Sequence, residues 1–318
     1  MSDPNPPVKP VKRRRLWLYL LVSVFFIALT VFGYYGYQVY QAMNQAYEPP
    51  TREKSEKRDS KVKITEDPVS ILLLGVDERK NDKGRSDTMI VMTINPRQQT
   101  VKMMNIPRDT YTVIPGRAGY DKINHAYAFG GTELAITSVE EFLDIPIDHY
   151  AKVNMKGFSR IIDELGGVEV DVPFDFEFQD YHFQQGPMLL DGDAAFRFTQ
   201  MRKDDPRGDL GRNERQQQVI KGILKKGTSA SSWSKWDDVL GQIGENVTTD
   251  ISPVDLLQLQ GIYKQLGNKK IETLTIEGEN KRIDRIFYYV VSDEEKARIQ
   301  LELREHLELP AEKTHAGR

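Results

Sequence analysis

The sequence predicts an α/β protein whose central mixed sheet carries helices on both faces, an αβα sandwich preceded by one N-terminal transmembrane helix. Three observations lead to this prediction: a long uncharged run near the N-terminus, short apolar runs typical of strands, and later segments with apolar residues at helical spacing. A chain of 318 residues allows one large domain or two small ones. We expect one continuous domain over residues 68–310.

The N-terminal run LWLYLLVSVFFIALTVFGYY, residues 16–35, contains no charge. At about 1.5 Å per residue, a helix of this length crosses the ~30 Å hydrocarbon core of a bilayer. Basic residues precede the run and residues 38–46 are uncharged, so the positive-inside rule predicts a cytoplasmic N-terminus. We expect a basic cytoplasmic tail at 1–15, a transmembrane helix at 16–36, and a single-pass protein of the cell membrane. The alternative is a cleaved secretory signal, whose apolar region is shorter.

The next segment, residues 37–67, contains Pro49-Pro50 and mixed charges with little apolar content, which is typical of an extracytoplasmic linker. Residues 311–318 are expected to form a flexible tail. The chain contains no cysteine, which excludes disulfides and thiolate metal sites. A domain of this size can fold on its hydrophobic core without cross-links.

Three short apolar or alternating runs predict three consecutive strands at Ser70–Val76, Met89–Ile94 and Val101–Ile106. The link Asn95-Pro96-Arg97-Gln98-Gln99 between the second and third runs is short enough for a hairpin turn. Two further strands are expected at Val168–Val172, where valines alternate before Pro173, and at Ile271–Ile276.

Apolar residues at helical spacing predict the helices. Two helices follow the third strand, over 135–143 and over 158–165, the second ending at Gly166-Gly167. Three more are expected around residues 219–224, 236–243 and 256–263. Strands interleaved with amphipathic helices favour a sheet covered on both faces.

The first concentration of charge lies at strand ends. Asp77 follows the first predicted strand, Arg85 and Asp87 precede the second, and Arg108 follows the third. In an antiparallel meander these four residues meet at one edge of the sheet. Two carboxylates with two arginines suit a divalent ion that bridges phosphate oxygens. The alternative is a solvated turn.

The second concentration lies in MRKDDPRGDLGRNERQ, just before a predicted helix. A glycine-containing loop that opens a helix offers N–H groups to an anion. The alternative is a basic loop paired with its own carboxylates. Nucleic acid is not expected as a partner, because the net charge is −3 and one loop is no basic face. The five histidines show no metal-ligand spacing, and His125 is expected to be structural.

Taken in order, GVDER, GRSDTM, NIPRDT, KINHAYAFGG, GFSRIIDELGGVEVDVP and MRKDDPRGDLGRNERQ resemble the LytR–CpsA–Psr (LCP) family of cell-wall assembly phosphotransferases. The resemblance is close over residues 68–228 and weaker to about 308. It implies transfer of an anionic glycopolymer, such as wall teichoic acid, from undecaprenyl pyrophosphate to the N-acetylmuramic acid 6-hydroxyl of peptidoglycan. It also implies Mg²⁺ or Mn²⁺ as the cofactor, and membrane lipid as a partner.

The resemblance also implies roles for individual residues. Asp77 and Asp87 would hold the metal, and Asp87, Asp109 and Arg108 would be catalytic, with Asp87 the first candidate for the base. The pyrophosphate would be bound by Arg85, Arg108, Lys122, Arg202, Asp209, Arg212, Arg215 and Gln216. An apolar slot for the lipid would draw on Phe129, Phe142, Phe158 and Ile162, which could equally be core.

One departure from the family pattern concerns Gln200, which stands where relatives commonly carry the first arginine of an R-x-R pair. Arg197 or Lys203 could supply the missing charge. Two other functions remain open beside the transferase. The same site could hydrolyse polyprenyl pyrophosphates, or the chain could be a non-catalytic lipid- or wall-binding relative, which Gln200 favours.

Overall fold

The computed structural model describes residues 12–77, 84–202, 204–227, 236–266 and 271–310. Its centre is a six-stranded sheet of order β11-β6-β1-β2-β3-β12. The strands are β1 (Val69–Val76), β2 (Ser86–Asn95), β3 (Thr100–Asn105), β6 (His149–Asn154), β11 (Val247–Thr249) and β12 (Glu272–Leu274). β1, β2 and β3 pair antiparallel, as expected, whereas β6 is parallel to β1 and β12 to β3. The prediction of a mixed central sheet is confirmed.

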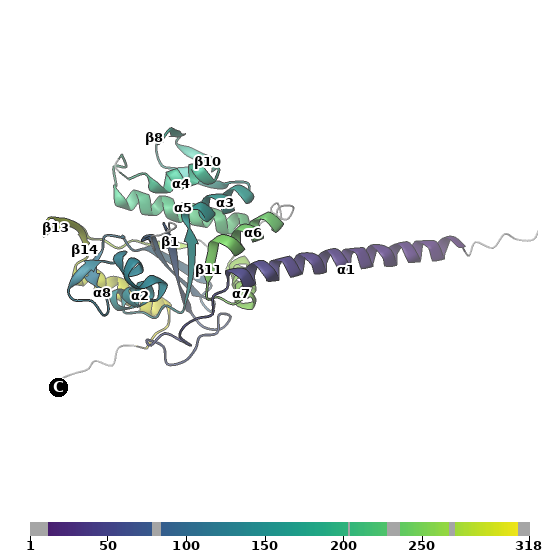
Figure 1. The fold of residues 1–318 in the computed structure, drawn as a ribbon, viewed down its shortest axis with the longest axis horizontal. Coiled ribbons are helices and arrows are strands. Elements are labelled where there is room, and N and C mark those ends of the chain that lie inside the picture. Colours follow the sequence, from purple (N-terminus) through teal and green to yellow (C-terminus); the bar gives the residue numbers. More distant parts are fainter. Residues whose placement is uncertain (1–11, 78–83, 203, 228–235, 267–270, 311–318) are drawn as a thin grey trace, which may run out of the picture.

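Alternation along β1 sends side chains to two helical layers (Figure 1). Leu72 and Leu74 pack in one cluster with α2 (His125–Leu143) and α8 (Asp293–His306). Ile71, from the opposite face, packs in a second cluster with residues of α5 (Asp209–Gly227) and α7 (Pro253–Leu266). Both faces of the sheet are therefore buried, which explains why β1 reads as a continuous apolar run.

A third cluster lies outside the central sheet, at the top of Figure 1. It is built from α3 (Met155–Glu164), α4 (Gly192–Gln200), part of α5, and two small antiparallel pairs. β7 (Val168–Val172) pairs with β10 (Gly186–Leu190), and β8 (Phe176–Phe178) pairs with β9 (Tyr181–Phe183). The strand predicted at 168–172 thus forms, but it pairs locally and does not extend the central sheet.

Two hairpins lie close to the carboxyl end of β3. They are β4 (Tyr111–Val113) with β5 (Tyr120–Lys122), and β13 (Glu279–Ile283) with β14 (Ile286–Val290). The backbone N–H of Tyr289 donates to the Asp109 carbonyl at 2.8 Å, which fixes the second hairpin beside the first. In Figure 1 the β13–β14 hairpin lies at the end of the molecule away from α1.

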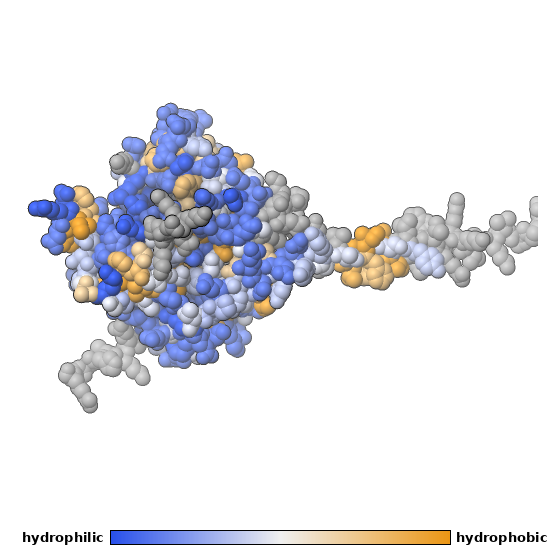
Figure 2. Space-filling model, in the orientation of Figure 1, coloured by the Kyte–Doolittle hydropathy of each residue, from blue (hydrophilic) through white to orange (hydrophobic). Residues whose placement is uncertain are grey.

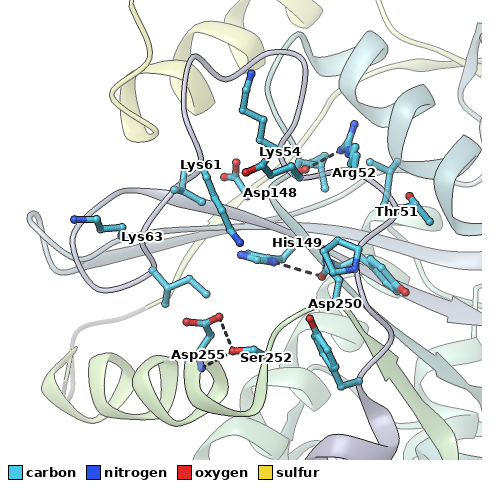
Figure 3. Close-up of a pocket in the computed structure, with 18 of the residues that line it drawn as sticks. Thr51, Arg52, Lys54, Lys61, Lys63, Asp148, His149, Asp250, Ser252 and Asp255 are labelled. Atoms are coloured by element: carbon cyan, nitrogen blue, oxygen red, sulfur yellow. Dashed lines mark hydrogen bonds and ion pairs between the residues drawn. The ribbon is translucent and has the colours of Figure 1, made fainter.

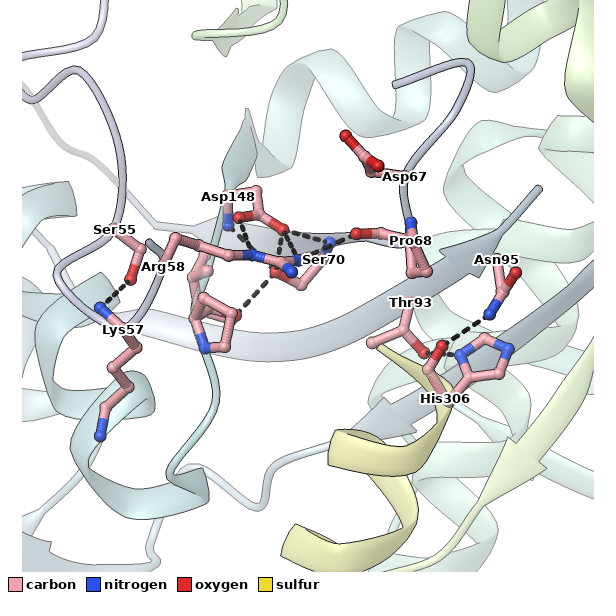
Figure 4. A network of polar contacts seen from close by, with 12 residues as sticks. Ser55, Lys57, Arg58, Asp67, Pro68, Ser70, Thr93, Asn95, Asp148 and His306 are labelled. Carbon is pink, nitrogen blue, oxygen red and sulfur yellow. Dashed lines mark hydrogen bonds and ion pairs between the residues drawn. The ribbon is translucent and has the colours of Figure 1, made fainter. Parts of the chain in front are cut away.

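The C-terminal helix α8 is attached to the sheet by His306. This residue is only 4% exposed, and its ring nitrogens contact the hydroxyls of Thr93 (2.7 Å) and Thr100 (2.8 Å). The Asn95 amide adds a bond to the His306 carbonyl at 2.9 Å (Figure 4). This helix was not among those predicted from the sequence.

The N-terminal helix α1 (Lys12–Ala46) projects from the globular body (Figure 1), and Figure 2 shows hydrophobic residues along it. In its last turns Ala42 and Ala46 are buried, and Ala42 and Gln45 lie close to Gly244 of α6 (Trp236–Asn246). Within the part of the chain whose placement is described, no helix is found that is long and apolar enough to span a bilayer. The tails 1–11 and 311–318 lie outside the described residues.

The linker expected at 37–67 is helical up to Ala46, the end of α1, and its remaining residues 47–67 lie against the folded body. We call this segment the strap. Arg52 binds Glu140 through two bonds of 2.7 and 2.9 Å, and Arg58 binds Asp148 through bonds of 2.9 and 2.7 Å (Figure 4). Ile64 is 3% exposed. The composition typical of linkers conceals these contacts, because each depends on one arginine meeting one distant carboxylate.

The strap closes over a cavity of about 560 Å³ that also involves β6 and α7 (Figure 3). Lys61, His149 and Asp250 are among its lining residues, and acids and bases are mixed around it. His149 opposes Ile71, early in β1. The cavity therefore lies at the end of β1 opposite Asp77.

Candidate functional site

The site begins where β1 ends and β2 starts. The N–H of Asp77 donates to the Arg85 carbonyl at 3.3 Å, and a bulge near Gly75 and Val76 shifts the pairing there. The sequence suggested that Asp87 precedes the second strand. In the structure β2 begins at Ser86, so Asp87 is the second residue of the strand. The Asp87 carboxylate accepts a bond of 2.8 Å from Arg108, which follows β3. These strand ends therefore converge as expected, although the Arg85 side chain is exposed.

The loop after β3 adds a second ion pair. Lys122, at the end of β5, donates to Asp109 Oδ1 at 2.6 Å, and Arg108 Nε lies 3.8 Å from Asp109 Oδ2. Both oxygens of Asp109 thus face a cation. Asp87, by contrast, is paired with Arg108 through Oδ1.

The first turns of α5 bring the second predicted group to the same edge. Arg202 Nε and Arg212 Nη2 lie 3.3 and 2.6 Å from Asp209 Oδ1. Gln216 joins α5 to the sheet, because its side chain accepts from Asn105 at 2.7 Å and donates to Thr88 at 3.3 Å. Asn105 and Thr88 were not predicted as site residues, although their polar side chains inside strands were an available signal.

Electrostatics connect the two groups. Burial lowers the pKa of the Arg212 guanidinium; Asp209 opposes this shift, while the charges of Arg108 and Arg202 add to it. Arg212 is 8% exposed, and its Nε has no hydrogen-bond partner among the described residues. Three like charges from three segments therefore converge around a buried donor that is not satisfied. Such an arrangement favours a multivalent anion.

Arg215 is placed differently from Arg212. Its side chain is 1% exposed, and it donates to the Asp205 carboxylate, to the Phe198 carbonyl at 2.9 Å and to the Met201 carbonyl. It therefore ties α5 to the loop after α4. Gly211 is required there, since a Cβ would lie 1.8 Å from Asp205 Oδ2. Arg215 was expected to bind the pyrophosphate. Its contacts instead match the alternative interpretation, a basic loop paired with its own carboxylates.

The other residues singled out in the sequence are distributed as follows. Phe142 is buried beneath the sheet with α2, Phe129 is 41% exposed, and Phe158 and Ile162 belong to the cluster around α3 and α4. The structure thus brings Phe158 and Ile162 together and places Phe142 in a different cluster. Gln200 accepts a bond of 3.2 Å from Arg197, and Lys203 lies outside the described residues. His125 contacts Asp121 at 2.9 Å.

The described residues contain no group of three or more His, Cys, Asp or Glu side chains that could hold a metal ion by itself. Asp77 and Asp87 are two hard oxygen donors at neighbouring strand ends. Mg²⁺ is commonly held by one or two carboxylates together with substrate phosphates. These two residues therefore fit an ion that arrives with, or is completed by, a phosphorylated substrate.

Comparison with known proteins gives the family. The model of the LytR_cpsA_psr family matches residues 31–305. The chain belongs to the LytR–CpsA–Psr family. A relative from Halalkalibacterium halodurans, named polyisoprenyl-teichoic acid–peptidoglycan teichoic acid transferase TagU, is 45% identical over 304 residues, covering 94% of this chain and all of the relative. The prediction that the chain is an enzyme is confirmed, because relatives of this similarity are named as transferases.

Solved LytR–CpsA–Psr structures share the fold. TagV of B. subtilis has a TM-score of 0.69 at 39% identity and covers 77% of this chain and 99% of its own. The family protein YwtF (TagT), solved with bound octaprenyl pyrophosphate lipid, has a TM-score of 0.68 at 30% identity, covering 82% of this chain and 99% of its own. A polyprenyl pyrophosphate is thus a ligand of one LytR–CpsA–Psr protein of the same fold.

Proposed function

We propose that this chain transfers an anionic glycopolymer, of the wall teichoic acid type, from undecaprenyl pyrophosphate to the 6-hydroxyl of N-acetylmuramic acid in peptidoglycan. Relatives named teichoic acid–peptidoglycan transferases support the reaction class. The single observation that carries the proposal is the convergence of Arg108, Arg202 and Arg212 around an unsatisfied buried guanidinium nitrogen. A pyrophosphate supplies the acceptor oxygens and the negative charge that this group lacks.

The bond changes assign work to the acids and bases of the site. The acceptor hydroxyl oxygen forms a bond to the phosphorus that carries the glycopolymer, and the pyrophosphate P–O bond to the lipid phosphate breaks. Undecaprenyl phosphate leaves, and the hydroxyl proton passes to a carboxylate. Asp87 is the better acceptor of that proton, because both oxygens of Asp109 already face Lys122 or Arg108. The arginines hold the phosphates in line and neutralise the developing charge.

Asp77 and Asp87 would hold Mg²⁺ or Mn²⁺, as their oxygen donors suit a hard cation. When bound, the ion supplies further neutralisation of the phosphate oxygens. Arg85, Lys122, Asp209 and Gln216 would complete the polar surroundings of the pyrophosphate. Asp209 does so by holding Arg202 and Arg212 in place, and Gln216 by fixing α5 to the sheet.

The proposed location is the cell membrane, with a cytoplasmic N-terminus and the folded body outside. This placement is supported by the uncharged run at 16–35 and by exposed apolar side chains on α1, among them Leu21, Phe25 and Ile27 at 62%, 62% and 63% exposure. A lipid-linked substrate resides in the same membrane, so anchoring would bring enzyme and donor together. The lipid chain would lie along Phe158 and Ile162, with Phe129 and Phe142 as further candidates.

The test uses the full chain in detergent with a polyprenyl-pyrophosphate-linked glycan, a peptidoglycan oligomer and Mg²⁺. A glycan–peptidoglycan phosphodiester supports the proposal. Free lipid monophosphate without that linkage would indicate a pyrophosphatase, and bound but unchanged donor would indicate a binding protein. Either result overturns the transferase proposal.

A matched pair of variants tests the site. Asp87→Ala should abolish turnover. Asp67→Ala should not, although Asp67 is similarly exposed and also pairs with an arginine, Arg97, at 2.9 Å. Mn²⁺ binding followed by electron paramagnetic resonance should weaken in Asp77→Asn and Asp87→Asn. Full activity in Asp87→Ala would contradict both roles given to this residue.

A further inference from the structure

An aromatic surface lies directly beside the candidate site on the β4–β5 hairpin. The register places Tyr111 opposite Lys122 and Val113 opposite Tyr120, so these side chains share one face of the hairpin. The rings of Tyr111 and Tyr120 stack with centroids 4.7 Å apart, and Tyr288 of β14 meets Tyr111 edge-on at 4.8 Å. We call Tyr111, Tyr120 and Tyr288 the tyrosine strip.

One end of the tyrosine strip is open to solvent. Tyr120 is 58% exposed, and its stacking with Tyr111 uses only one face of the ring. An exposed tyrosine whose ring is already held in position has little side-chain entropy to lose on binding. Its free face therefore offers a fixed, flat apolar contact with a hydroxyl at its tip.

The other end of the strip reaches the ion pairs of the site. The Lys122 ammonium lies 5.7 Å from the Tyr288 ring centroid and 2.6 Å from Asp109 Oδ1, and Arg108 links Asp109 to Asp87. A path of contacting groups thus runs from Tyr120 to Asp87. Along this path, Asp87 is matched by Arg108 and Asp109 by Lys122. The charges of these two pairs cancel along the path, whereas Arg202 and Arg212 share the single carboxylate of Asp209.

This difference in charge separates the two substrates of the proposed reaction. A pyrophosphate belongs with Arg202 and Arg212, whereas a sugar ring presents apolar C–H faces and neutral hydroxyls. The strip also neighbours the β13–β14 hairpin, at the end of the molecule away from α1, where hydrophobic residues lie beside a hydrophilic tip (Figures 1 and 2). A membrane that contains α1 would lie at the opposite end.

We infer that the tyrosine strip is the subsite for the acceptor glycan, an N-acetylated amino-sugar chain of peptidoglycan. This inference rests on the proposed function and adds the place where the acceptor binds. A sugar ring packs on the free face of Tyr120, and the chain extends past Tyr111 toward Lys122 and Asp109. Tyr288 is only 8% exposed and supports the Tyr111 ring without contacting the glycan. The reacting hydroxyl then enters the site from the side opposite to the arginine group.

The test measures binding and transfer separately with the full chain. Fluorescence anisotropy of a labelled peptidoglycan tetrasaccharide gives the Kd, and transfer assays give KM for acceptor and donor. Tyr120→Ala should raise the acceptor Kd and KM about tenfold and leave the donor KM unchanged. Tyr120→Phe, which keeps the ring, should bind nearly as the wild type. Tyr40→Ala removes a tyrosine of similar exposure, 56%, from α1 and should have no effect.

The outcomes distinguish the two proposals. If the wild type transfers but Tyr120→Ala leaves the acceptor Kd within twofold, the subsite is wrong and the proposed function stands. If the wild type binds the tetrasaccharide through Tyr120 without transfer, the proposed function fails and the subsite stands. Loss of binding to phosphatidylglycerol vesicles, with unchanged saccharide binding, in Tyr120→Ala would overturn the glycan assignment in favour of a lipid surface.

Discussion

Lowering the pH should loosen the C-terminal helix through one buried imidazole. His306 lies between the Thr93 and Thr100 hydroxyls and is 4% exposed. Burial lowers its pKa from 6.5 to about 4, and the nearby Lys102 ammonium contributes in the same direction. The neutral ring is therefore the form that the folded state accepts.

The size of the effect follows from linkage. Below pH 6.5 the unfolded chain binds a proton at this residue, whereas the folded chain does not until about pH 4. Stability is consequently lost as the pH falls through this window. Between pH 7.5 and pH 5 the loss amounts to about 2 kcal/mol, on the order of one and a half pKa units at ~1.4 kcal/mol each.

Urea unfolding followed by circular dichroism measures this loss. His306→Gln should be less stable than the wild type at pH 7.5, because the contacts with the two threonines are altered. The variant has no group that titrates at this position, so its deficit should shrink by about 2 kcal/mol at pH 5. Comparing the two proteins cancels the contribution of the other acids. A deficit of the same size at both pH values would refute the reasoning.

Three further predictions concern packing. Arg215→Met removes the close cation of the buried Asp205 carboxylate, leaving only Arg207 Nε at 4.0 Å from Oδ1, and should cost about 3–5 kcal/mol of unfolding free energy in urea. Arg207→Met removes this longer contact and the exposed pair with Glu214, and should cost about 1 kcal/mol or less. Equal losses would contradict a structural role for Arg215. Gly211→Ala forces a Cβ against Asp205 and should destabilise by about 1–3 kcal/mol. Gly241→Ala should not destabilise the protein, because there is open space around Gly241. If Gly211→Ala left the stability unchanged, the close approach of Asp205 to Gly211 would be refuted. Arg58→Ala should speed proteolytic cleavage within the strap more than Arg97→Ala, and equal rates would show that Arg58 does not hold it.

The parts of the fold that could be predicted are those with a local pattern. β1, β2 and β3 are apolar runs long enough to be recognised, and their order fixed which charged residues met at the edge of the sheet. β6 was missed, because HYAKVN interrupts its apolar residues with Lys152, whose ammonium lies 5.9 Å from the Tyr127 ring. The β13 segment ENKRI has almost no apolar residue and depends on its partner β14.

The candidate site was predictable for a related reason. Asp87 and Arg108 lie near the ends of recognisable strands, so their meeting follows from strand order. Lys122 belongs to the short strand β5, which was not predicted from the sequence, and its place beside Asp109 was not expected from strand order. Arg212 and Arg215 could not be told apart in the sequence, since both are arginines in one turn of α5. Their roles depend on which face of the helix meets Asp205.

The strap determines how far the site can move relative to α1. Because α1 ends against α6 and the next residues are fixed by Arg52 and Arg58, the connection between helix and body has no slack. If α1 anchors the protein as proposed, the site would lie at a fixed distance from the lipid surface. The enzyme could not reach acceptors at varying depths in the wall, as it could with a flexible linker. It would find acceptors only within one thin layer, and lateral diffusion in the membrane would decide where new polymer is attached.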